Sequence, residues 1–306
     1  MNFLVVGPGA MGCLFAARLK KAGHIVKLVD HSPERADHIN AHGIRVEGVT
    51  GEYKVPVPTV VGRVSEKPDV ALICVKANRT RDVGEALATW LSKKTHILTL
   101  QNGIGNLEIL QEALGDHTVL GGVTAQGATV LSPGHVRHAG EGETVIGPEG
   151  HPVGEIVSAF NRAGFDTRSV RDVNSLIWGK LIVNVGINAL TAITRLKNGR
   201  LPEIEGTRRV MEEAVGEAVA VAEAKDVNLP YPDPIERVLE VCRATSGNIA
   251  SMLQDILNQR ITEVDFINGA IVREATALGI AAPVNRTLTS LVKAIHGSYG
   301  DRIDGQ

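Results

Sequence analysis

Short apolar runs alternate with stretches of helical periodicity over the first half of the chain, up to about residue 168. The expected strands are Phe3–Val6, Ile25–Val29, Val70–Val75 and Ile97–Leu100. The expected helices around them are Phe15–Ala22, Ala36–Ala41, Val83–Leu91 and Leu107–Leu114. Uninterrupted apolar strands separated by helices are typical of a parallel sheet covered on both faces. Later runs, broken by proline and glycine, are expected as antiparallel additions at one edge: Thr118–Ala125, Gly134–His138 and Glu143–Ile146.

The second half of the chain loses the strand pattern and keeps helical periodicity. Helices are expected at Asn174–Thr194, Glu205–Lys225, Pro234–Val241, Ile249–Leu278 and Thr287–His296. Glycine, proline and asparagine stand at the breaks between them, where such residues end helices. The fold class is therefore α/β followed by all-α, with one domain over residues 1–168 and a second over residues 169–306. A small ligand, and with it an active site, is expected in the cleft between the two domains.

A glycine-rich motif joins the first expected strand to the first expected helix. Gly7-Pro8-Gly9-Ala10-Met11-Gly12 fits the pattern GxGxxG. Glycines at these positions allow a tight turn, a close approach of pyrophosphate and close packing of helix on strand. The helix N-terminus adds free N–H groups and the positive end of its dipole. In this context the motif predicts a Rossmann-type dinucleotide-binding domain; the alternative is a tight strand–helix turn without a ligand.

Asp30 bears on the choice of dinucleotide, because it ends the second expected strand. A carboxylate at this position can bind the ribose hydroxyls of NAD and would repel the 2′-phosphate of NADP. His31 and Arg35 lie close enough in sequence to weaken that repulsion. The residue types therefore favour NAD over NADP, unless Asp30 serves only as a helix cap or a solvated acid.

Lys180, Asn184 and Asn188 recur at i, i+4 and i+8 and so line one face of an otherwise apolar helix. Buried amide and ammonium groups need partners, so the stripe is expected to face a polar ligand, or else to form a hydrogen-bond network between helices. Lys180 is the candidate proton donor for a ketone reduction, because burial lowers the pKa of an amine. Asn198 extends the stripe if the helix continues, but Asn198-Gly199 is equally a helix stop.

Four more polar residues are candidate ligand contacts. Ser251 can hydrogen-bond a carboxylate, and Glu263, expected within an apolar helix, can pair with Lys180 or hold a substrate hydroxyl. Lys76 and Asn102 follow two of the main strands, at the carboxyl edge of the sheet where ligands bind. Exposed surface positions for the first two, and capping or turn roles for the other two, are the alternatives.

Composition narrows the class of protein. The chain has 306 residues, with 32 Lys+Arg against 34 Asp+Glu and 3% aromatic residues, which argues against a nucleic-acid partner. Three widely spaced cysteines, Cys13, Cys74 and Cys242, fit neither a disulfide framework nor a metal site. The apolar stretch Leu181–Ile193 is short and contains two asparagines, and a strand starts at the N-terminus, so neither a membrane span nor a targeting peptide is expected. The expectation is a cytoplasmic, two-domain protein.

Several of these segments together resemble the ketopantoate reductase (2-dehydropantoate 2-reductase) family. The resemblance runs over essentially the whole chain, and the lysine–asparagine helix and the late serine–glutamate segment are more specific than the glycine motif. The segments that carry it are Gly7-Pro8-Gly9-Ala10-Met11-Gly12, Ile73-Cys74-Val75-Lys76, Gln101-Asn102-Gly103-Ile104-Gly105, Trp178-Gly179-Lys180-Leu181-Ile182-Val183-Asn184, Ser251-Met252-Leu253-Gln254-Asp255 and Thr262-Glu263-Val264-Asp265-Phe266-Ile267-Asn268-Gly269.

The resemblance implies a role for each matching residue. Lys180 corresponds to the general acid that protonates the 2-oxo oxygen, and Glu263 to a glutamate near both substrate and cofactor. The implied substrate contacts are Asn184, Asn188, Asn198 and Ser251. The implied cofactor contacts are the six motif residues, Lys76, Asn102 and Glu263. Asp30, the remaining candidate cofactor contact, departs from the family, whose members often carry a basic residue beyond the second strand.

The implied reaction is the reduction of 2-dehydropantoate to pantoate, a step towards pantothenate and coenzyme A. The family usually prefers NADPH, whereas Asp30 argues for NADH, so NADP(H) is expected on family grounds and NAD(H) on electrostatic ones. Reduction of another 2-oxo acid, opine formation, and a nucleotide sensor without turnover are the rival functions. The expected partner is a small 2-oxo acid, with no membrane involved, and the chain is expected to be a monomer or a homodimer.

Overall fold

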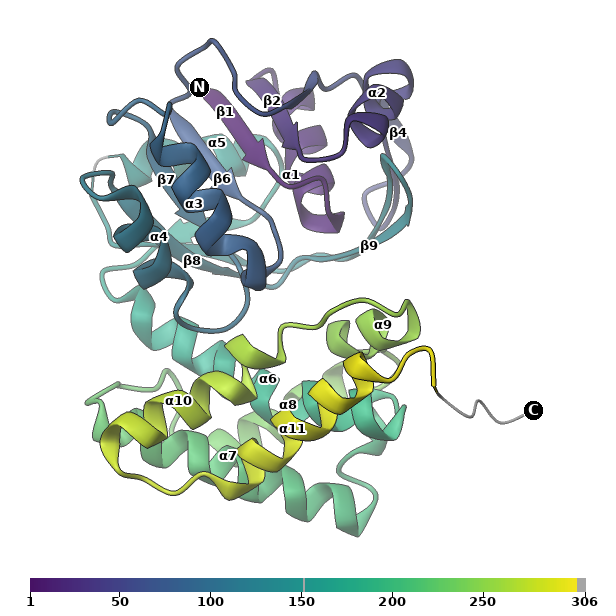
Figure 1. Cartoon of the computed structure of the whole chain (residues 1–306), viewed down its shortest axis with the longest axis vertical. Coiled ribbons are helices and arrows are strands. Elements are labelled where there is room, and N and C mark those ends of the chain that lie inside the picture. Colours follow the sequence, from purple (N-terminus) through teal and green to yellow (C-terminus); the bar gives the residue numbers. More distant parts are fainter. Residues whose placement is uncertain (151, 302–306) are drawn as a thin grey trace. The chain divides into compact units, whose positions relative to one another are not determined.

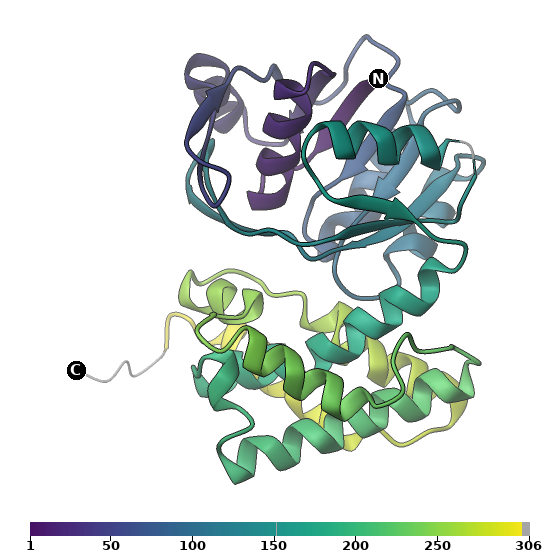
Figure 2. The ribbon, with the colours of Figure 1, turned by 180° about the vertical axis from the view of Figure 1, so that it is seen from behind.

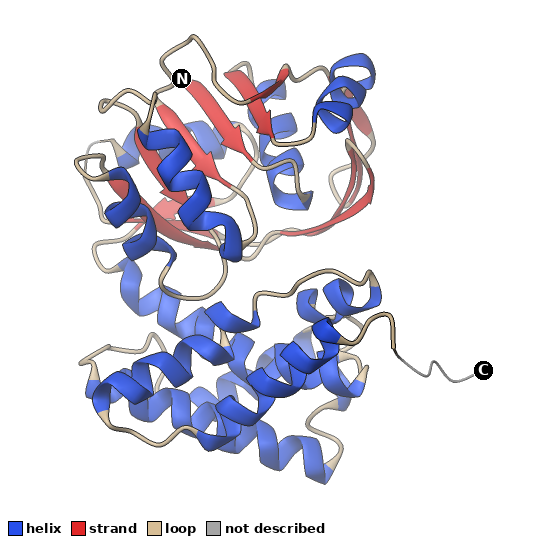
Figure 3. Ribbon diagram, viewed as in Figure 1, coloured by secondary structure: helices blue, strands red, loops and turns tan. Residues whose placement is uncertain are grey.

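The computed structural model describes residues 1–150 and 152–301 and divides the chain into two compact units. Unit 1 consists of Met1–Gln101 and Asn106–Val173, and unit 2 consists of Asn102–Gly105 and Asn174–Gln306. Every strand of the described residues lies in unit 1, whereas unit 2 is helical, as the colouring of Figure 3 shows. The expected succession of an α/β part and an all-α part is therefore confirmed.

An eight-stranded sheet forms the centre of unit 1 (Figure 1). Its strand order is β12-β11-β8-β7-β6-β1-β2-β5, and β11 and β8 are its one antiparallel pair within the described residues. The bounds are β1 Asn2–Val6, β2 Ile25–Asp30, β5 Thr59–Val61, β6 Val70–Ile73, β7 His96–Thr99, β8 Val119–Thr124, β11 Thr144–Gly147 and β12 Thr167–Ser169. In the register, Val5 lies opposite Leu28 on one side and Leu72 on the other.

Both faces of this sheet are buried because successive side chains of each strand enter opposite cores. Phe3 and Val5 belong to a core shared with α1 (Ala10–Lys21) and α5 (Val153–Arg162). Leu4 and Val6 belong to a second core, shared with α3 (Thr80–Ala88) and α4 (Asn106–Leu114). In Figure 2, which views the molecule from behind, α5 covers the face opposite to that covered by α3 in Figure 1. This double cover explains why the strands read as uninterrupted apolar runs.

A second, four-stranded sheet in unit 1 was not expected. Its order is β4-β3-β10-β9, and helix α1 packs against it as well as against the main sheet. Its bounds are β3 Ile44–Gly48, β4 Tyr53–Val55, β9 Gly127–Ser132 and β10 His135–Gly140. The prediction that all three late runs are antiparallel additions at one edge is wrong in two respects. β10 belongs to the second sheet, where it pairs in parallel with β3, and β8 extends the main sheet but pairs in parallel with β7. Of the three runs, only β11 is an antiparallel addition to the main sheet. The sequence did not indicate these pairings, because pairing between distant segments leaves no local pattern.

Unit 2 is a bundle of helices around one apolar core. Its helices are α6 Val173–Thr194, α7 Glu205–Ala224, α8 Pro234–Ala244, α9 Ser251–Leu257, α10 Asn268–Leu278 and α11 Pro283–Gly297. The prediction of a single helix over 249–278 is wrong, because the helix ends after α9 and a new one begins at α10. There Gln259 adopts a left-handed backbone conformation, with φ 52°, and the short 3₁₀ turn η3 (Val264–Phe266) precedes α10.

The apolar stretch Leu181–Ile193 is part of a longer helix, α6, which by length and composition alone could cross a bilayer. Helix α6 has 22 residues with a mean hydropathy of 1.6 in its most apolar window, and 67% of that window is buried within the protein. A mostly buried apolar helix is also typical of the centre of a globular domain.

Candidate functional site

The glycine motif is shaped partly by the fold of unit 1 itself. Gly7 has φ 105°, and a Cβ there would come within 2.8 Å of the Val75 side chain. A Cβ on Gly12 would overlap the carbonyl oxygen of Gly7. The Gly7 amide donates to the carbonyl of Val29, 3.0 Å away, which ties the turn to β2. Glycine is therefore required at positions 7 and 12 whether or not a ligand binds.

Gly9 differs from the other two glycines because the fold does not require it. It is exposed, has the ordinary backbone angles φ −70° and ψ −174°, and a Cβ there would lie 3.9 Å from its nearest neighbour, the carbonyl oxygen of Cys74. It is also the N-cap of α1, which has no side-chain cap and no acidic residue in its first turn. An open backbone at an uncapped helix N-terminus suits a phosphate. Pro8, Ala10 and Met11 are partly exposed beside it.

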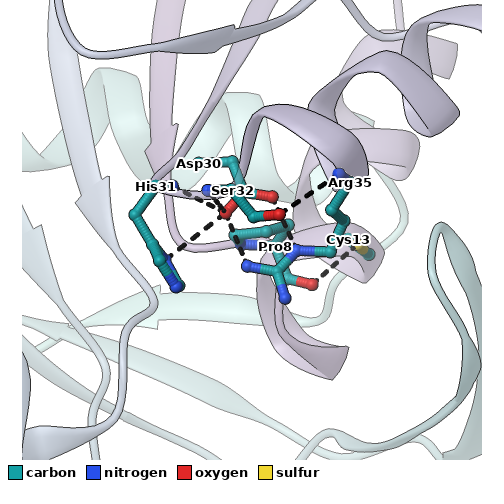
Figure 4. A network of polar contacts seen from close by, with 6 residues as sticks. All are labelled: Pro8, Cys13, Asp30, His31, Ser32 and Arg35. Carbon is teal, nitrogen blue, oxygen red and sulfur yellow. Dashed lines mark hydrogen bonds and ion pairs between the residues drawn. The ribbon is translucent and has the colours of Figure 1, made fainter.

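The Asp30 carboxylate lies at the end of β2 and is enclosed by hydrogen-bond donors (Figure 4). Its Oδ2 accepts from Nε of Arg35 at 2.6 Å, and its Oδ1 accepts from Nη2 at 2.5 Å. Oδ1 also accepts from the backbone amides of His31 and Ser32, at 2.7 and 3.1 Å. Burial alone would raise the pKa of Asp30, but the bonds from Arg35 and the two amides outweigh it and hold the pKa below its usual value.

Cys13 packs beneath this network as a small apolar residue. Its Sγ donates to the carbonyl oxygen of Pro8 at 3.4 Å, and burial raises the pKa of the thiol to about 12. A thiol that stays protonated at neutral pH is neither a nucleophile nor a metal ligand.

Lys76 and Asn102 follow neighbouring strands, β6 and β7, as expected for the carboxyl edge of a sheet. Lys76 is exposed, whereas Asn102 is half-buried. Gln101, which the sequence argument did not single out, donates through Nε2 to the Val75 carbonyl at 2.8 Å and to the Thr80 hydroxyl at 2.9 Å. These bonds tie the loop after β6 to the end of β7. The sequence feature that could have identified Gln101 is an amide side chain directly after a buried strand.

The loop Asn102–Gly105 belongs to unit 2, although the strand before it belongs to unit 1. The Ile104 amide donates to the carbonyl oxygen of Phe266 at 3.1 Å. Gly103 has φ 85°, and a Cβ there would overlap the same carbonyl oxygen. Since Phe266 ends η3 and Glu263 precedes it, the loop brings Asn102 and Glu263 into one unit.

The stripe Lys180, Asn184 and Asn188 lies on α6, as the spacing predicted. Asn188 is buried, and Lys180 and Asn184 are half-buried. Burial lowers the pKa of Lys180 to about 8, against a partial opposing effect of the Glu263 carboxylate. An amine with this pKa holds a proton at neutral pH and releases it readily, which suits a general acid.

Three expected placements in unit 2 need correction or refinement. Asn198 does not extend the stripe, because α6 ends at Thr194 and Arg195 has a left-handed φ of 58°. Asn198 instead lies buried in a short 3₁₀ turn and donates to the Thr245 hydroxyl at 2.9 Å. Glu263 lies in the turn before η3 and not in a helix, and Ser251 is exposed at the first position of α9.

A hydrogen-bond network between the helices of unit 2 does exist, but it is built from residues that the sequence argument missed. Asn268 donates to the Val185 carbonyl of α6 at 3.2 Å and to the Asn285 side chain at 2.9 Å. Asn285 in turn donates to Glu217 of α7 at 2.7 Å. These side chains are widely separated in sequence, so no local pattern indicates them. Within residues 1–150 and 152–301, no group of three or more potential metal ligands gathers.

Two family models match consecutive parts of the chain. The ketopantoate reductase PanE/ApbA model matches residues 3–150, and the ketopantoate reductase PanE/ApbA C-terminal model matches residues 172–296. Among curated relatives, a 2-dehydropantoate 2-reductase of Halobacterium salinarum is 38% identical over 299 residues, covering 96% of this chain and 98% of the relative. That of Pyrococcus horikoshii is 35% identical over 298 residues, covering 96% and 97%.

Solved structures with the same fold include enzymes with different names. The PanE/ApbA family ketopantoate reductase from Ralstonia eutropha has a TM-score of 0.91 and 35% identity, covering 97% of this chain and 99% of that one. D-Mandelate dehydrogenase, solved with NADH and anilino(oxo)acetate, has a TM-score of 0.89 and 27% identity, with the same coverage.

Proposed function

Because the chain belongs to the ketopantoate reductase family, we propose that it reduces 2-dehydropantoate to pantoate, using a reduced nicotinamide dinucleotide. The observation that carries the proposal is Lys180, a half-buried amine with a pKa near 8 on a helix otherwise apolar, in a chain that matches 2-dehydropantoate reductases over nearly its full length. The dinucleotide supplies a hydride to the 2-oxo carbon and is itself oxidised. A proton must reach the ketone oxygen for the alcohol to form.

Lys180 is the proton donor in this proposal. Its ammonium stabilises the negative charge that develops on the 2-oxo oxygen and then transfers a proton from Nζ to that oxygen. The neutral amine takes up a proton from solvent before the next turnover. Glu263 supports the role, because its carboxylate favours the charged form of Lys180 and so prevents burial from lowering the pKa further.

Polar side chains of unit 2 bind the substrate in this proposal. Asn184 and Asn188 share the face of α6 with Lys180, one and two turns further along the helix. Asn198 and Ser251 are proposed as contacts for the carboxylate and hydroxyl of the substrate. The partner is accordingly a small 2-oxo acid, and we place the enzyme in the cytoplasm as a monomer or homodimer.

The glycine motif binds the pyrophosphate of the dinucleotide in this proposal, and the open backbone at Gly9 supports that fit. Lys76 and Asn102, which follow β6 and β7, contact the nicotinamide half in this proposal, and Glu263 lies in the same unit as Asn102. For the form of the dinucleotide, NADP(H) is favoured by the family and NAD(H) by the mere presence of an acid at position 30.

A second candidate is the reduction of a different 2-oxo acid. The likeness to D-mandelate dehydrogenase favours it, because that enzyme has the same fold, at a TM-score of 0.89. A shared fold leaves the side chains that contact the substrate free to differ.

The test is the turnover of the purified chain with 2-dehydropantoate and with phenylglyoxylate, the 2-oxo acid that corresponds to mandelate. NADH and NADPH are supplied in parallel, and nicotinamide absorbance is followed. We expect oxidation that depends on 2-dehydropantoate, with a kcat/KM at least a hundredfold above that for phenylglyoxylate. A reversed order would select the second candidate. No oxidation with either acid would refute the reduction of 2-dehydropantoate and of a mandelate-type 2-oxo acid.

A further inference from the structure

We propose that Arg35 determines which dinucleotide this chain takes, by binding the 2′-phosphate of NADPH from a position that Asp30 fixes. The inference rests on the proposed function only in that it requires a nucleotide at the glycine motif. By residue type, Asp30 was expected to bind the ribose of NAD and to disfavour NADP; here it supports NADPH binding. The acid positions a cation and does not itself bind the ribose.

The Asp30 carboxylate is closed to a ribose hydroxyl in this structure. Its side chain is 0% exposed. Its two oxygens accept four hydrogen bonds, two from the Arg35 guanidinium and two from the backbone amides of His31 and Ser32. Three of these bonds go to Oδ1 and one to Oδ2, and because the side chain is fully buried no remaining acceptor position is open to solvent. A ribose hydroxyl would have to displace Arg35 from a paired, charge-assisted arrangement, which is the stronger kind of hydrogen bond.

Arg35 presents the charge that remains accessible. Its side chain is 33% exposed, and within the described part of the chain no acceptor is bonded to its Nη1. The guanidinium is planar, so two of its nitrogens can hold Asp30 while the third faces outward. A 2′-phosphate carries up to two negative charges, and an arginine side chain suits phosphate geometry better than it suits two neutral hydroxyls.

The surroundings of Arg35 strengthen this preference. The His31 imidazole is 84% exposed and lies 3.5 Å from Asp30 Oδ1, so a second basic group stands at the same strand end. Ser32 caps α2 (Pro33–His42) and accepts from the Arg35 amide at 3.3 Å, which places Arg35 in the first turn of a helix whose N-terminus attracts anions. Glu34 is the one exposed acid in that turn, and it makes no contact with Asp30 in the described structure.

Binding of nucleotide fragments tests the proposal without requiring turnover. Adenosine 2′,5′-bisphosphate and 5′-AMP differ in the 2′-phosphate, and their dissociation constants for the full chain are measured by calorimetry. We expect the bisphosphate to bind at least tenfold more tightly than 5′-AMP. In Arg35→Gln its affinity should fall about ten- to a hundredfold, the range for one charge-assisted hydrogen bond, while that of 5′-AMP changes less than about threefold.

Further variants separate Arg35 from a merely structural role. Asp30→Asn should weaken the bisphosphate about three- to tenfold and leave 5′-AMP unchanged, because Arg35 is then held less firmly. The double variant Asp30→Asn/Arg35→Gln leaves no unpaired buried charge, so it stays folded if Arg35→Gln alone does not, and it should show the full loss. Arg168→Gln is the matched control, because Arg168 forms a two-bond ion pair with Glu143 at the opposite edge of the same sheet.

Four results of these binding measurements would count against the proposal or its premise. Equal affinity for the two fragments in the unaltered chain, or a loss of 5′-AMP binding in Asp30→Asn, would overturn the inference and return Asp30 to the ribose. If Arg168→Gln weakened bisphosphate binding as much as Arg35→Gln does, the effect would come from the net charge of the protein and not from Arg35, which would also overturn the inference. If neither fragment nor dinucleotide binds, it is the dinucleotide part of the proposed function that fails.

Discussion

Lys180 illustrates how one side chain can be assigned a function from its surroundings. The spacing of Lys180, Asn184 and Asn188 on an apolar helix is visible in the sequence, and the structure adds the size of the effect on the amine. Burial lowers its pKa to about 8, and Glu263, 83 residues further along the chain, limits that fall. An ordinary surface lysine titrates about two units higher.

A pH profile tests this proton donor. Reduction needs the protonated amine, so kcat/KM should be level below about pH 8 and fall about tenfold per unit above it, whereas kcat/KM of the reverse oxidation should rise over the same range. Lys180→Ala should lose about a hundred- to ten-thousandfold in kcat and show no inflection near pH 8, with the dissociation constant of the dinucleotide unchanged within about threefold. Steady-state rates from pH 6 to 10 and equilibrium titration measure these quantities.

The control for this variant is Lys225→Ala, because Lys225 lies in the same unit and forms an ordinary surface ion pair with Glu274. It should retain the wild-type profile. An inflection near pH 8 that persists in Lys180→Ala, or a parallel loss of dinucleotide affinity, would contradict the assignment.

At the scale of elements, the glycine motif is a strand–turn–helix unit in which glycine is needed for different reasons at its three positions. The fold itself requires Gly7 and Gly12, because a side chain at either position would collide with a neighbouring residue. A side chain at Gly9 would strike no neighbouring residue, because its Cβ would lie 3.9 Å from the nearest atom. The pattern GxGxxG does not make this distinction; the surroundings of each Cβ position do.

Two matched variants separate folding from binding within the motif. Gly9→Ala should leave the free energy of unfolding unchanged or raise it by up to about 1 kcal/mol, because its backbone angles are open to any residue. Its affinity for dinucleotide should fall at least tenfold, because the new methyl group occupies the path of the pyrophosphate. Gly12→Ala should lose about 3 kcal/mol or more, as expected for overpacking against a backbone oxygen.

Denaturant unfolding and a fluorescence titration with the dinucleotide measure the two effects on the same samples. If Gly9→Ala kept wild-type affinity, the open backbone at Gly9 would not be the phosphate site. Equal destabilisation by the two variants would mean that the turn itself, and not the ligand, requires Gly9.

Elements whose identity depends on local pattern were predicted well, and those that depend on distant partners were not. The main parallel strands and the helices α6, α7 and α8 follow their hydrophobic periodicity. The second sheet escaped prediction because β3 and β10 are partly exposed and pair with each other across some 90 residues. The interruption between α9 and α10 lies in a stretch whose composition alone does not mark a break.

At the scale of the whole molecule, the two units have separate apolar cores with no shared residue. The proposed nucleotide-binding residues Gly7–Gly12 and Arg35 lie in unit 1, and Lys180 and Asn184 lie in unit 2. The loop Asn102–Gly105 is the exception, because it follows a strand of unit 1 and packs within unit 2.

Amide hydrogen exchange on the full chain tests this division. Adenosine 2′,5′-bisphosphate at a hundred times its dissociation constant should slow exchange in β1, α1 and the β2–α2 turn, and leave α7 and α8 unchanged. A ligand at that concentration stabilises the state that binds it by about 2.7 kcal/mol, which is large enough to detect as slower opening. Equal protection of α7 would show that the units do not respond separately. Exchange in the same chain without any ligand gives the baseline.

The sequence by itself determined the order of an α/β and an all-α part, the glycine motif at a strand–helix junction, and a lysine–asparagine face on a buried helix. These are properties of short segments, because periodicity and spacing act through the nearest turns of the chain. Only the tertiary structure decided that Arg35 covers the Asp30 carboxylate, that Ile104 bonds to Phe266, and that Asn198 leaves the α6 stripe. These depend on which groups meet in space, since the charge, burial and pKa of a side chain are set by neighbours that the linear order does not identify.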